Sequence, residues 1–305
     1  MDSSSSVRNI KRVCCQLEAD IDSGVILNAQ HRAVPICKFG QDQVSTNDLV
    51  TIEEPLEIRV GYYDNGELRE NSLSITMRTP GDDADLACGF LLSEGIIKEY
   101  SQIRAISEEV PSGDESSSAN VVTIKLQESS TFDPDSLLRH FYTTSSCGVC
   151  GKVSLATVRV HVPQHEATDF CISTAEIAQL PTRLRQRQQE FAKTGGLHAS
   201  ALFDCHANIL RVREDVGRHN ALDKLLGSFR ETGIGSLRSN GLLLSGRASF
   251  ELLQKAAIAG IPFVASIGPP SSLAVDLARD QGITLLGFLR DQTFNLYHGD
   301  RVVSD

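Results

Sequence analysis

The sequence lacks an apolar run that approaches the roughly 18–20 residues needed to span a bilayer. Its first residues, Met1-Asp-Ser-Ser-Ser-Ser, hold an early acid where a signal peptide has its apolar core. Without export, eight irregularly spaced cysteines in 305 residues are expected to be reduced thiols, because disulfide frameworks belong to oxidising compartments. We therefore expect a cytoplasmic protein that does not bind a membrane.

An excess of positive charge is also lacking. The formal net charge is −10, whereas nucleic-acid affinity depends on many contacts from Lys and Arg to phosphates. Basic residues do gather at Arg8 to Arg12 and at Arg183 to Arg187, but both stretches are short and are interpreted as a tail and a solvated helix face. We expect no nucleic-acid partner, while a small phosphorylated ligand stays open.

Three regions of the chain differ in composition and in the pattern of their apolar residues. Residues 1–48 are polar and irregular and predict a tail or a loosely packed arm. Residues 49–142 mix alternating strands with helical stretches and predict a small α+β domain. Residues 143–305 alternate short apolar strands with helices, a pattern typical of a mixed or parallel sheet covered on both faces. The fold class predicted is thus α/β, with a small N-terminal α+β domain followed by a mixed-sheet α/β domain.

Individual elements follow from periodicity and from cap and turn signals. In the first domain we predict strands at 56–60, 73–77 and 121–126, a helix that Asp82 or Asp83 caps and Gly95 closes, a solvated loop at 107–120, and a short helix from Asp133-Pro134. In the second domain we predict a capping box at Ser173 and Glu176, strands at 199–203, 209–213, 242–244, 263–266 and 284–288, and helices at 181–193, 219–226, 250–259 and 273–279.

Cys147 and Cys150 lie two residues apart in Thr143-Thr-Ser-Ser-Cys-Gly-Val-Cys-Gly-Lys152. Turn amides, helix N-termini and a cation such as Lys152 lower the pKa of a thiol and so favour the nucleophilic thiolate. A closed zinc site usually presents a second pair of ligands, and this sequence has no second Cys-x-x-Cys. The pair alone leaves redox or sulfur-transfer chemistry, zinc binding and no chemistry as alternatives.

Three strand-to-helix connections in the second half share polar residues and glycine. Helix N-termini and glycine backbones suit an anion, and Arg218 and Arg247 can each hold two of its oxygens. The connections match neither the Walker nor the dinucleotide pattern, so a phosphate site competes with ordinary capping and turn chemistry. They are Asp215-Val-Gly-Arg-His-Asn220, Ser245-Gly-Arg-Ala-Ser249 and Ser266-Ile-Gly-Pro-Pro-Ser-Ser272.

Several motifs occur along the chain from about Glu54 to Val302 and leave residues 1–48 largely outside. They are Ser-Ser-Cys-Gly-Val-Cys-Gly-Lys152, Gly195-Gly-Leu-His-Ala199, Glu-Asp-Val-Gly-Arg-His-Asn-Ala-Leu-Asp-Lys224 and Leu-Ser-Gly-Arg247, with Glu54-Pro-Leu-Glu-Ile-Arg59, Thr79-Pro-Gly-Asp82, Gly89-Phe-Leu-Leu-Ser-Glu-Gly-Ile96, Pro-Pro-Ser-Ser-Leu-Ala-Val275 and Leu-Leu-Gly-Phe-Leu-Arg290. Together and in this combination they resemble the FdhD family of sulfur carriers that mature formate dehydrogenases.

The resemblance implies a sulfurtransferase that accepts sulfane sulfur from a cysteine desulfurase and passes it to a molybdenum cofactor with two pyranopterin guanine dinucleotides, for a formate dehydrogenase catalytic subunit. It implies a cytidine-deaminase-like second domain, a homodimer, and a GDP-like part of the cofactor that binds alone. Cys147 is then expected to carry the persulfide, and Cys150 to assist acceptance or to resolve the persulfide.

For the nucleotide, the resemblance points to Phe288, Leu289, Arg290, Asp291, Gln292 and Thr293, with Arg290 on phosphate. Asp223 is a candidate acceptor for guanine N1 and N2, or else a helix ion-pair partner. His198 and His219 can donate to phosphate or hold a loop. Ser245, Gly246, Arg247 and Arg218 complete the predicted cofactor-binding set, and no metal ligands are predicted.

Three other interpretations compete. A zinc nucleoside deaminase needs His-x-Glu followed by Pro-Cys-x-x-Cys, but Ser200 stands at the Glu position and the cysteine pair precedes His198. A cofactor chaperone without sulfur turnover predicts nucleotide binding and no persulfide. A dithiol–disulfide oxidoreductase predicts cycling between Cys147 and Cys150, although the pair lacks a thioredoxin-like strand–helix context.

Overall fold

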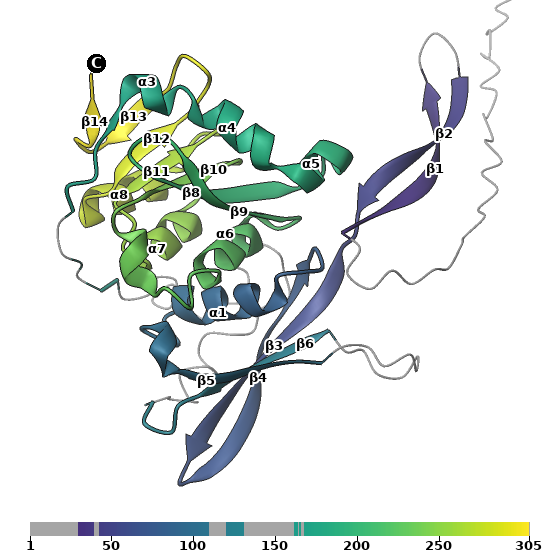
Figure 1. The fold of residues 1–305 in the computed structure, drawn as a ribbon, viewed down its shortest axis with the longest axis vertical. Coiled ribbons are helices and arrows are strands. Elements are labelled where there is room, and N and C mark those ends of the chain that lie inside the picture. Colours follow the sequence, from purple (N-terminus) through teal and green to yellow (C-terminus); the bar gives the residue numbers. More distant parts are fainter. Residues whose placement is uncertain are drawn as a thin grey trace, which may run out of the picture.

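The computed structural model of the protein describes residues 30–39, 43–109, 120–130, 162–163, 165 and 168–304, which form a mixed α/β fold (Figure 1). Its strands are β1 (His31–Phe39), β2 (Gln43–Thr51), β3 (Glu54–Asp64), β4 (Glu67–Arg78), β5 (Ile103–Glu109), β6 (Val121–Leu126), β7 (Ile172–Ser173), β8 (His198–Phe203), β9 (Ile209–Asp215), β10 (Gly241–Leu244), β11 (Phe263–Ser266), β12 (Thr284–Gly287), β13 (Asn295–His298) and β14 (Val302–Val303). Its helices are α1 (Asp83–Ser93), α3 (Thr174–Ile177), α4 (Leu180–Arg187), α5 (Gln189–Thr194), α6 (Arg218–Gly227), α7 (Phe250–Ile258) and α8 (Ser272–Gln281), with 3₁₀ turns at Tyr100–Gln102 and Ile234–Leu237. Within these ranges no helix has both the length and the apolar character that a membrane crossing requires.

The smaller sheet has the strand order β4-β3-β6-β5. The predicted hairpin of β3 and β4 is confirmed, and its turn takes positive φ at Asn65 and Gly66, as a tight hairpin requires. Alternate residues of β3, led by Leu56, Ile58 and Val60, are buried against α1. One face of this sheet is therefore covered by a single helix.

The larger sheet has the order β13-β12-β11-β10-β8-β9 and is mixed. Strands β10, β11 and β12 are parallel, while β8, β9 and β13 each run antiparallel to a neighbour. Successive side chains alternate between two cores: Leu242 and Leu244 pack toward α6, α7 and α8, whereas Leu243 packs toward α3 and α4. Both faces are thus covered, which confirms the mixed α/β prediction for this part of the chain.

Helix α1 lies between the smaller sheet and α6, so it joins the two halves (Figure 1). The two helices approach so closely that a Cβ atom added at Gly89 would stand 1.8 Å from the carbonyl oxygen of Asp223. A Cβ atom at Gly227 would stand 1.9 Å from the carbonyl oxygen of Asp85. Glycine at both positions is therefore a requirement of the crossing and not of turn chemistry.

Buried ion pairs surround this crossing. Lys224 Nζ lies 2.8 Å from Asp215 Oδ2, and neither side chain has any exposed surface. Asp215 also accepts from the backbone N–H of Thr79, and Lys224 donates to the Thr79 carbonyl, so the pair ties α6 to the end of β4. On the other side of α6, Arg213 holds the Asp85 carboxylate of α1 at 2.7 Å.

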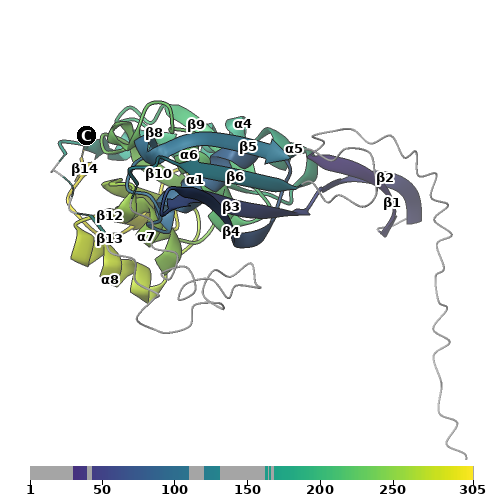
Figure 2. The same cartoon turned by 90° about the horizontal axis from the view of Figure 1, so that it is seen from below.

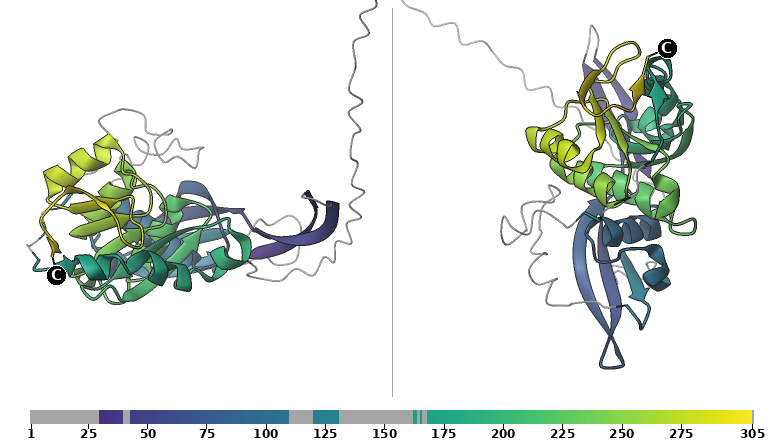
Figure 3. Two further views of the ribbon diagram at one scale, coloured as in Figure 1. Left: turned by 90° about the horizontal axis from the view of Figure 1, so that it is seen from above. Right: turned by 90° about the vertical axis from the view of Figure 1, so that its left-hand side faces the viewer.

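Strands β1 and β2 form a separate two-stranded hairpin, which we call the arm (residues 31–51 as described). The arm projects from the body in Figures 1 and 2 and in the left view of Figure 3. The sequence predicted a tail or arm here without regular structure, so the nine-residue strands are a difference from that prediction. Periodicity missed them because none of the side chains described in the arm is buried, and burial on one face is what creates a clear alternating pattern.

Other boundaries also differ from the predictions. Strand β5 extends to Glu109, into the predicted solvated loop. The predicted helix at 181–193 is two helices, α4 and α5, because the backbone at Gln188 leaves helical geometry. Asp82 is the residue before α1 but makes no capping bond, since its own backbone is left-handed. The predicted helix from Asp133 lies outside the described residues.

Candidate functional site

The three polar connections meet at the carboxyl ends of β9, β10 and β11. Gly268 donates its backbone N–H to the Gly246 carbonyl at 2.9 Å, which joins the second connection to the third. A Cβ atom at Gly246 would stand 3.3 Å from His198 Nδ1, so His198 lies directly against the second connection. His198 pairs across β8 and β9 with Asp215, where the first connection begins. The structure thus brings together the connections that the sequence grouped.

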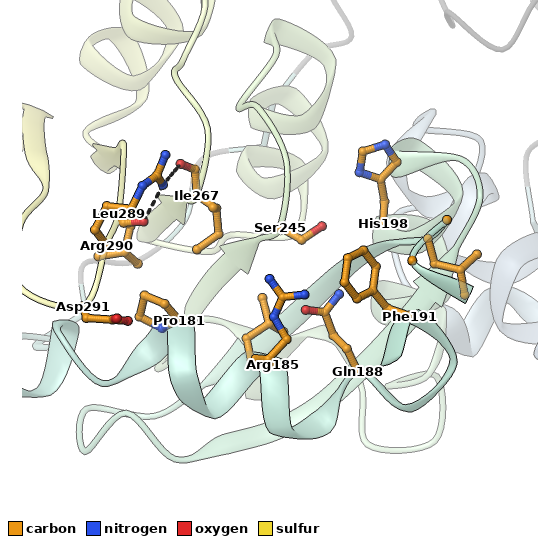
Figure 4. Close-up of a pocket in the computed structure, with 14 residues that line it drawn as sticks. Pro181, Arg185, Gln188, Phe191, His198, Ser245, Ile267, Leu289, Arg290 and Asp291 are labelled. Carbon is orange, nitrogen blue, oxygen red and sulfur yellow. Dashed lines mark hydrogen bonds between the residues drawn. The ribbon is translucent and has the colours of Figure 1, made fainter. Parts of the chain in front are cut away.

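Beside this edge a cavity of about 610 Å³ opens between α4, α5 and the end of the sheet (Figure 4). Such a volume is typical of a small-molecule site. Of the predicted cofactor-binding residues, Ser245, Leu289, Arg290 and Asp291 line the cavity, together with His198. The remaining lining residues are Pro181, Leu184, Arg185, Gln188, Phe191, Gly195, Gly196, Leu197 and Ile267.

Arg185 is a lining residue that the sequence analysis missed, because it was interpreted as part of a solvated helix face. Its guanidinium lies 4.7 Å from the centre of the Phe191 ring, a cation–π contact between α4 and α5. In Figure 4 it points from the helix toward Ser245. The spacing of Pro181, Leu184, Arg185 and Gln188 carried the signal, because positions i, i+3, i+4 and i+7 share one helix face.

The turn after β12 supplies the opposite wall. Phe288 has a φ of 53°, which ends the strand one residue earlier than predicted. Backbone bonds from Phe288 to Gly268 and from Leu289 to Ser266 hold the turn onto the third connection. Arg290 Nη1 donates to the carbonyls of Ile267 at 2.7 Å and Leu289 at 2.8 Å, which fixes the guanidinium at the cavity rim. Gln292 and Thr293 belong to the same turn but do not line the cavity.

Electrostatics at this edge favour an anion. Burial, and then the neighbouring Arg218 and His219, lower the pKa of His198, whereas Asp215 raises it. Within the described part of the chain, Arg185, Arg218 and Arg247 make no ion pair with a carboxylate. Three guanidinium groups without a carboxylate partner leave a local excess of positive charge.

His219 has a different environment from His198. Its Nε2 lies 3.9 Å from Glu251 and is buried, and the imidazole lowers the pKa of the Glu251 carboxyl to about 2. Arg218, His219, Gly246 and Arg247 do not line the cavity itself. They stand beside it, around His198 and along the second connection, where Arg247 is exposed to solvent.

Asp223 lies apart from the cavity. The sequence offered it as a guanine acceptor or else as a helix ion-pair partner, and its side chain is buried in α6 at the crossing with α1. Its carboxylate lies 2.9 Å from Lys255 Nζ and accepts from Ser93 Oγ at 2.7 Å. Burial opposes the charge of Lys255, but the carboxylates of Asp223 and Glu94 together raise its pKa. These contacts are those of a buried ion pair, the second of the two roles that the sequence left open.

Cys147 and Cys150, the predicted sulfur site, lie outside the described residues. Among the cysteines that the structure does describe, Cys88 is buried in α1, and this burial raises the pKa of its thiol to about 12. Cys171 and Cys205 are exposed.

Comparison with known proteins agrees with the motif pattern. Residues 51–303 match the model of the FdhD/NarQ family. The chain is 48% identical over 272 residues to the "Sulfur carrier protein FdhD" of Streptomyces coelicolor, covering 88% of this chain and 94% of that protein. It is 44% identical over 270 residues to the protein of the same name from Mycobacterium tuberculosis, covering 86% and 94%.

A solved structure from Desulfotalea psychrophila, described as a formate dehydrogenase accessory protein, is similar in fold. Its TM-score is 0.67 at 22% sequence identity, and the match covers 90% of this chain and all of the other. At this identity the match concerns the fold alone. The family match and the two curated relatives carry the assignment: this chain belongs to the FdhD/NarQ family.

Proposed function

We propose that this protein is a sulfur carrier in the maturation of formate dehydrogenase. It accepts sulfane sulfur from a cysteine desulfurase as a persulfide and transfers it to the molybdenum cofactor with two pyranopterin guanine dinucleotides. The single observation that carries the proposal is the 48% identity over 88% of the chain to a protein named a sulfur carrier. The pair Cys147 and Cys150 supplies thiols for that chemistry.

In the first step, the thiolate of Cys147 attacks the terminal sulfur of the donor persulfide. A new S–S bond forms on Cys147 as the S–S bond of the donor breaks, and the donor leaves as a thiolate. The exchange needs no added oxidant or reductant, because one thiolate replaces another. Cys88 does not suit this role, since a thiol with a pKa of about 12 is protonated at neutral pH.

The cavity suits the anionic part of the cofactor. The guanine nucleotide is part of the substrate, and its phosphates face Arg185 and Arg290 and, beside the cavity, Arg218 and Arg247. Backbone amides of the second connection add donors at the same edge. These groups bind and orient the cofactor, while Phe191 offers an aromatic face on which a base can stack.

Asp291 replaces Asp223 as our choice for guanine recognition. It is the one carboxylate among the described residues that line the cavity, and it lies next to Arg290 on the same turn. A carboxylate accepts from the guanine N1 and N2 donors as a pair, which an adenine cannot supply. A preference for GDP over ADP is therefore expected of this protein.

The carrier step is tested by measuring the mass of the protein after it has been loaded with sulfur. The protein is incubated with a cysteine desulfurase and cysteine, and adducts are mapped by peptide mass spectrometry in the wild type, Cys147→Ala and Cys150→Ala. We expect a gain of about 32 Da, one sulfur atom, on Cys147, lost in Cys147→Ala. Cys171→Ala and Cys205→Ala are matched controls, because both thiols are exposed and neither is assigned a role.

Two results would contradict the carrier step. If no adduct forms while GDP still binds, the protein acts as a cofactor chaperone without sulfur turnover. If the wild type instead cycles a Cys147–Cys150 disulfide against small disulfides and takes up no sulfur, the dithiol–disulfide oxidoreductase interpretation replaces it.

A further inference from the structure

A second cavity, of about 590 Å³, opens at the opposite end of the larger sheet. Pro262 and Ile283 line it just before β11 and β12 begin, whereas the first cavity includes Ile267, which directly follows β11. The four residues of β11, at about 3.3 Å each, place the two cavities roughly 13 Å apart. Among the described residues none lines both cavities, so the second is a separate candidate site.

His165 brings an unpartnered acceptor to the second cavity. Its Nε2 lies 2.9 Å from the carbonyl oxygen of Ala257 and, because a carbonyl can only accept, Nε2 carries the ring hydrogen. Burial lowers the pKa of His165, and Arg238 lowers it further against the opposing effect of backbone carbonyls, so the ring is neutral at neutral pH. Nδ1 is therefore a bare acceptor, and it is buried without a hydrogen-bond partner in the described part of the chain.

Two arginines bring positive charge to the same cavity. Arg301 lines it, and its Nη1 donates to the carbonyls of Thr168 at 2.7 Å and Phe170 at 3.3 Å. Arg238 lies beside it, since a Cβ atom added at the lining residue Gly260 would stand 3.2 Å from the Cγ atom of Arg238. Within the described ranges, the Nε atoms of both arginines are buried and have no hydrogen-bond partner. The cavity wall therefore holds donors that lack an acceptor.

Negative charge gathers at this cavity as well. Helices α7 and α8 both end at it, through Ala257 and Gly260 for α7 and through Gln281 and Gly282 for α8. The carboxyl end of a helix carries partial negative charge. Asp280 lines the cavity too, and its carboxylate forms no ion pair with another described residue. A ligand that carries only one sign of charge would thus meet like charge somewhere in the wall.

We propose that the second cavity binds a free α-amino acid with an apolar side chain. The carboxylate of this zwitterion accepts from Nε of Arg301, and its ammonium donates to Nδ1 of His165 and to the carboxylate of Asp280. An α-amino acid fits this wall because a single carbon atom separates its two charges. One small molecule then satisfies a buried donor and a buried acceptor together.

The rest of the wall sets the class of side chain. Burying a charged side chain without a partner is costly, whereas an apolar one gains from apolar neighbours. The volume of the cavity lies in the range of small-molecule sites and leaves room for a branched side chain. The apolar lining residues are Val162, Pro163, Ile261, Pro262 and Ile283.

The first experiment titrates L-leucine, N-acetyl-L-leucine and L-leucinamide into the full-length wild-type protein in a calorimeter. We expect L-leucine to bind, and both analogues to bind about tenfold or more weakly, because each lacks one of the two charges. No binding of L-leucine, L-valine or L-methionine at millimolar concentration would overturn the proposal. Equal affinity for the two analogues and L-leucine would overturn it as well, since a site for peptides needs no free ammonium and carboxylate.

A repeat of the L-leucine titration at saturating GDP separates this site from the proposed function. We expect L-leucine to bind with GDP present, because the two cavities share no described residue. Competition between L-leucine and GDP would place the amino acid in the first cavity and overturn the proposal. A protein that binds L-leucine but not GDP would contradict the proposed function and leave the amino-acid site intact.

The second experiment compares two aspartates of α8. Asp280→Asn removes the carboxylate from the cavity, whereas Asp276→Asn is the matched control, since Asp276 lies 3.6 Å from Arg279 and does not line the cavity. We expect the affinity for L-leucine to fall about tenfold in Asp280→Asn and to stay within about twofold in Asp276→Asn. Equal affinity in both variants would overturn the role of Asp280. Equal unfolding temperatures show that both variants fold.

Nitrogen NMR of the histidine rings tests the contact at His165 directly. The variant His165→Gln identifies the signals of this ring in the wild-type spectrum. L-leucine is expected to shift the resonance of Nδ1, which gains a hydrogen bond, and to leave that of Nε2, which stays bonded to Ala257. An Nδ1 resonance that does not move at saturating L-leucine would overturn the proposed contact.

Discussion

The crossing of α1 and α6 and the cavity beside β10 are both rich in charge, but they differ in how that charge is satisfied. At the crossing, Asp215, Asp223 and Asp85 each face a Lys or Arg within 3 Å. Around the cavity, Arg185 has an aromatic ring as its described partner, and Arg290 is held by carbonyl oxygens. Burying a charge without a partner is costly, so complete pairing is what a structural contact requires. Cations that lack a carboxylate at an open edge are instead available to an anionic ligand.

Removal of a charge from the crossing is expected to have the largest effect. Lys224→Ala leaves the Asp215 carboxylate buried without its cation, and this should lower the free energy of unfolding by about 3–5 kcal/mol. Urea denaturation measures the change. Arg247→Ala is the matched control at the cavity side, where loss of an exposed cation should change stability by less than about 0.5 kcal/mol. An equal loss of unfolding free energy in the two variants would show that the buried and the exposed cation contribute alike to stability.

Overpacking of the crossing comes next. Gly89→Ala places a Cβ atom 1.8 Å from the Asp223 carbonyl oxygen, so α1 and α6 must move apart. A loss of about 3 kcal/mol is expected, at the upper end for overpacked cores, because backbone and not a pliable side chain blocks the space. Gly235→Ala is the control, since nothing lies within 4 Å of its added Cβ atom. A change below about 1 kcal/mol for Gly89→Ala would show that the helices adjust freely.

Asp291 and Asp223 are expected to differ in what their substitution changes, ligand binding for Asp291 and stability for Asp223. Asp291→Asn should weaken GDP binding by about tenfold and leave stability unchanged, because the carboxylate acts only on the ligand. Asp223→Asn should lower stability by about 2 kcal/mol, because the buried Lys255 ammonium keeps only Glu94 of its two carboxylate partners, while GDP affinity stays within about twofold. Calorimetric titration and denaturation of both variants complete the comparison. The reverse pattern would return guanine recognition to Asp223.

The smallest expected effect is a pH dependence at His198. Its pKa is lowered by burial, Arg218 and His219, so between that value and the ordinary value near 6.5 the unfolded chain binds more protons. The contribution of His198 to the free energy of unfolding is therefore lost as pH falls below about 6.5. A bound phosphate has the opposite influence, because its charge favours the imidazolium, so binding takes up a proton.

GDP affinity of the wild type, relative to that of His198→Gln, should consequently rise by a few-fold, at most about tenfold, as pH falls from about 7.5 to 5.5. Dividing the affinity of the wild type by that of His198→Gln cancels the effect of protonation of the GDP phosphates, because both proteins bind the same ligand. An identical pH profile in both proteins would mean that His198 does not sense the ligand.

The elements that the sequence predicted well are those that are well buried. Strand β10, with Leu242 to Leu244, is a short apolar run that is buried at every position, and the helix from Phe250 is apolar and buried along most of its length. Strand β13 and the arm lack such a pattern, and both were missed. The sequence also grouped the three connections correctly, because parallel strands present their carboxyl ends at one edge.

The pairing of charges could not be predicted in the same way. Asp215, Asp223 and Asp291 are the same residue type in the sequence. The fold brings Lys224 to Asp215 and Lys255 to Asp223. Among the described residues, Asp291 has only the neighbouring Arg290 beside it in the cavity wall. Arg185 reaches the cavity because a turn about a hundred residues later forms the opposite wall. Contacts of this range depend on tertiary packing, which local periodicity does not record.

Calorimetric titration of GDP into the wild type, Arg185→Ala and Arg183→Ala measures whether the cations of the cavity hold a guanine nucleotide. Both arginines lie on α4, but Arg183 faces away from the cavity and donates to the His206 carbonyl and Asn208. We predict GDP binding in the wild type and in Arg183→Ala, and affinity about tenfold or more lower in Arg185→Ala. No binding of GDP to the wild type, or equal affinity in all three proteins, would mean that these cations do not hold the nucleotide.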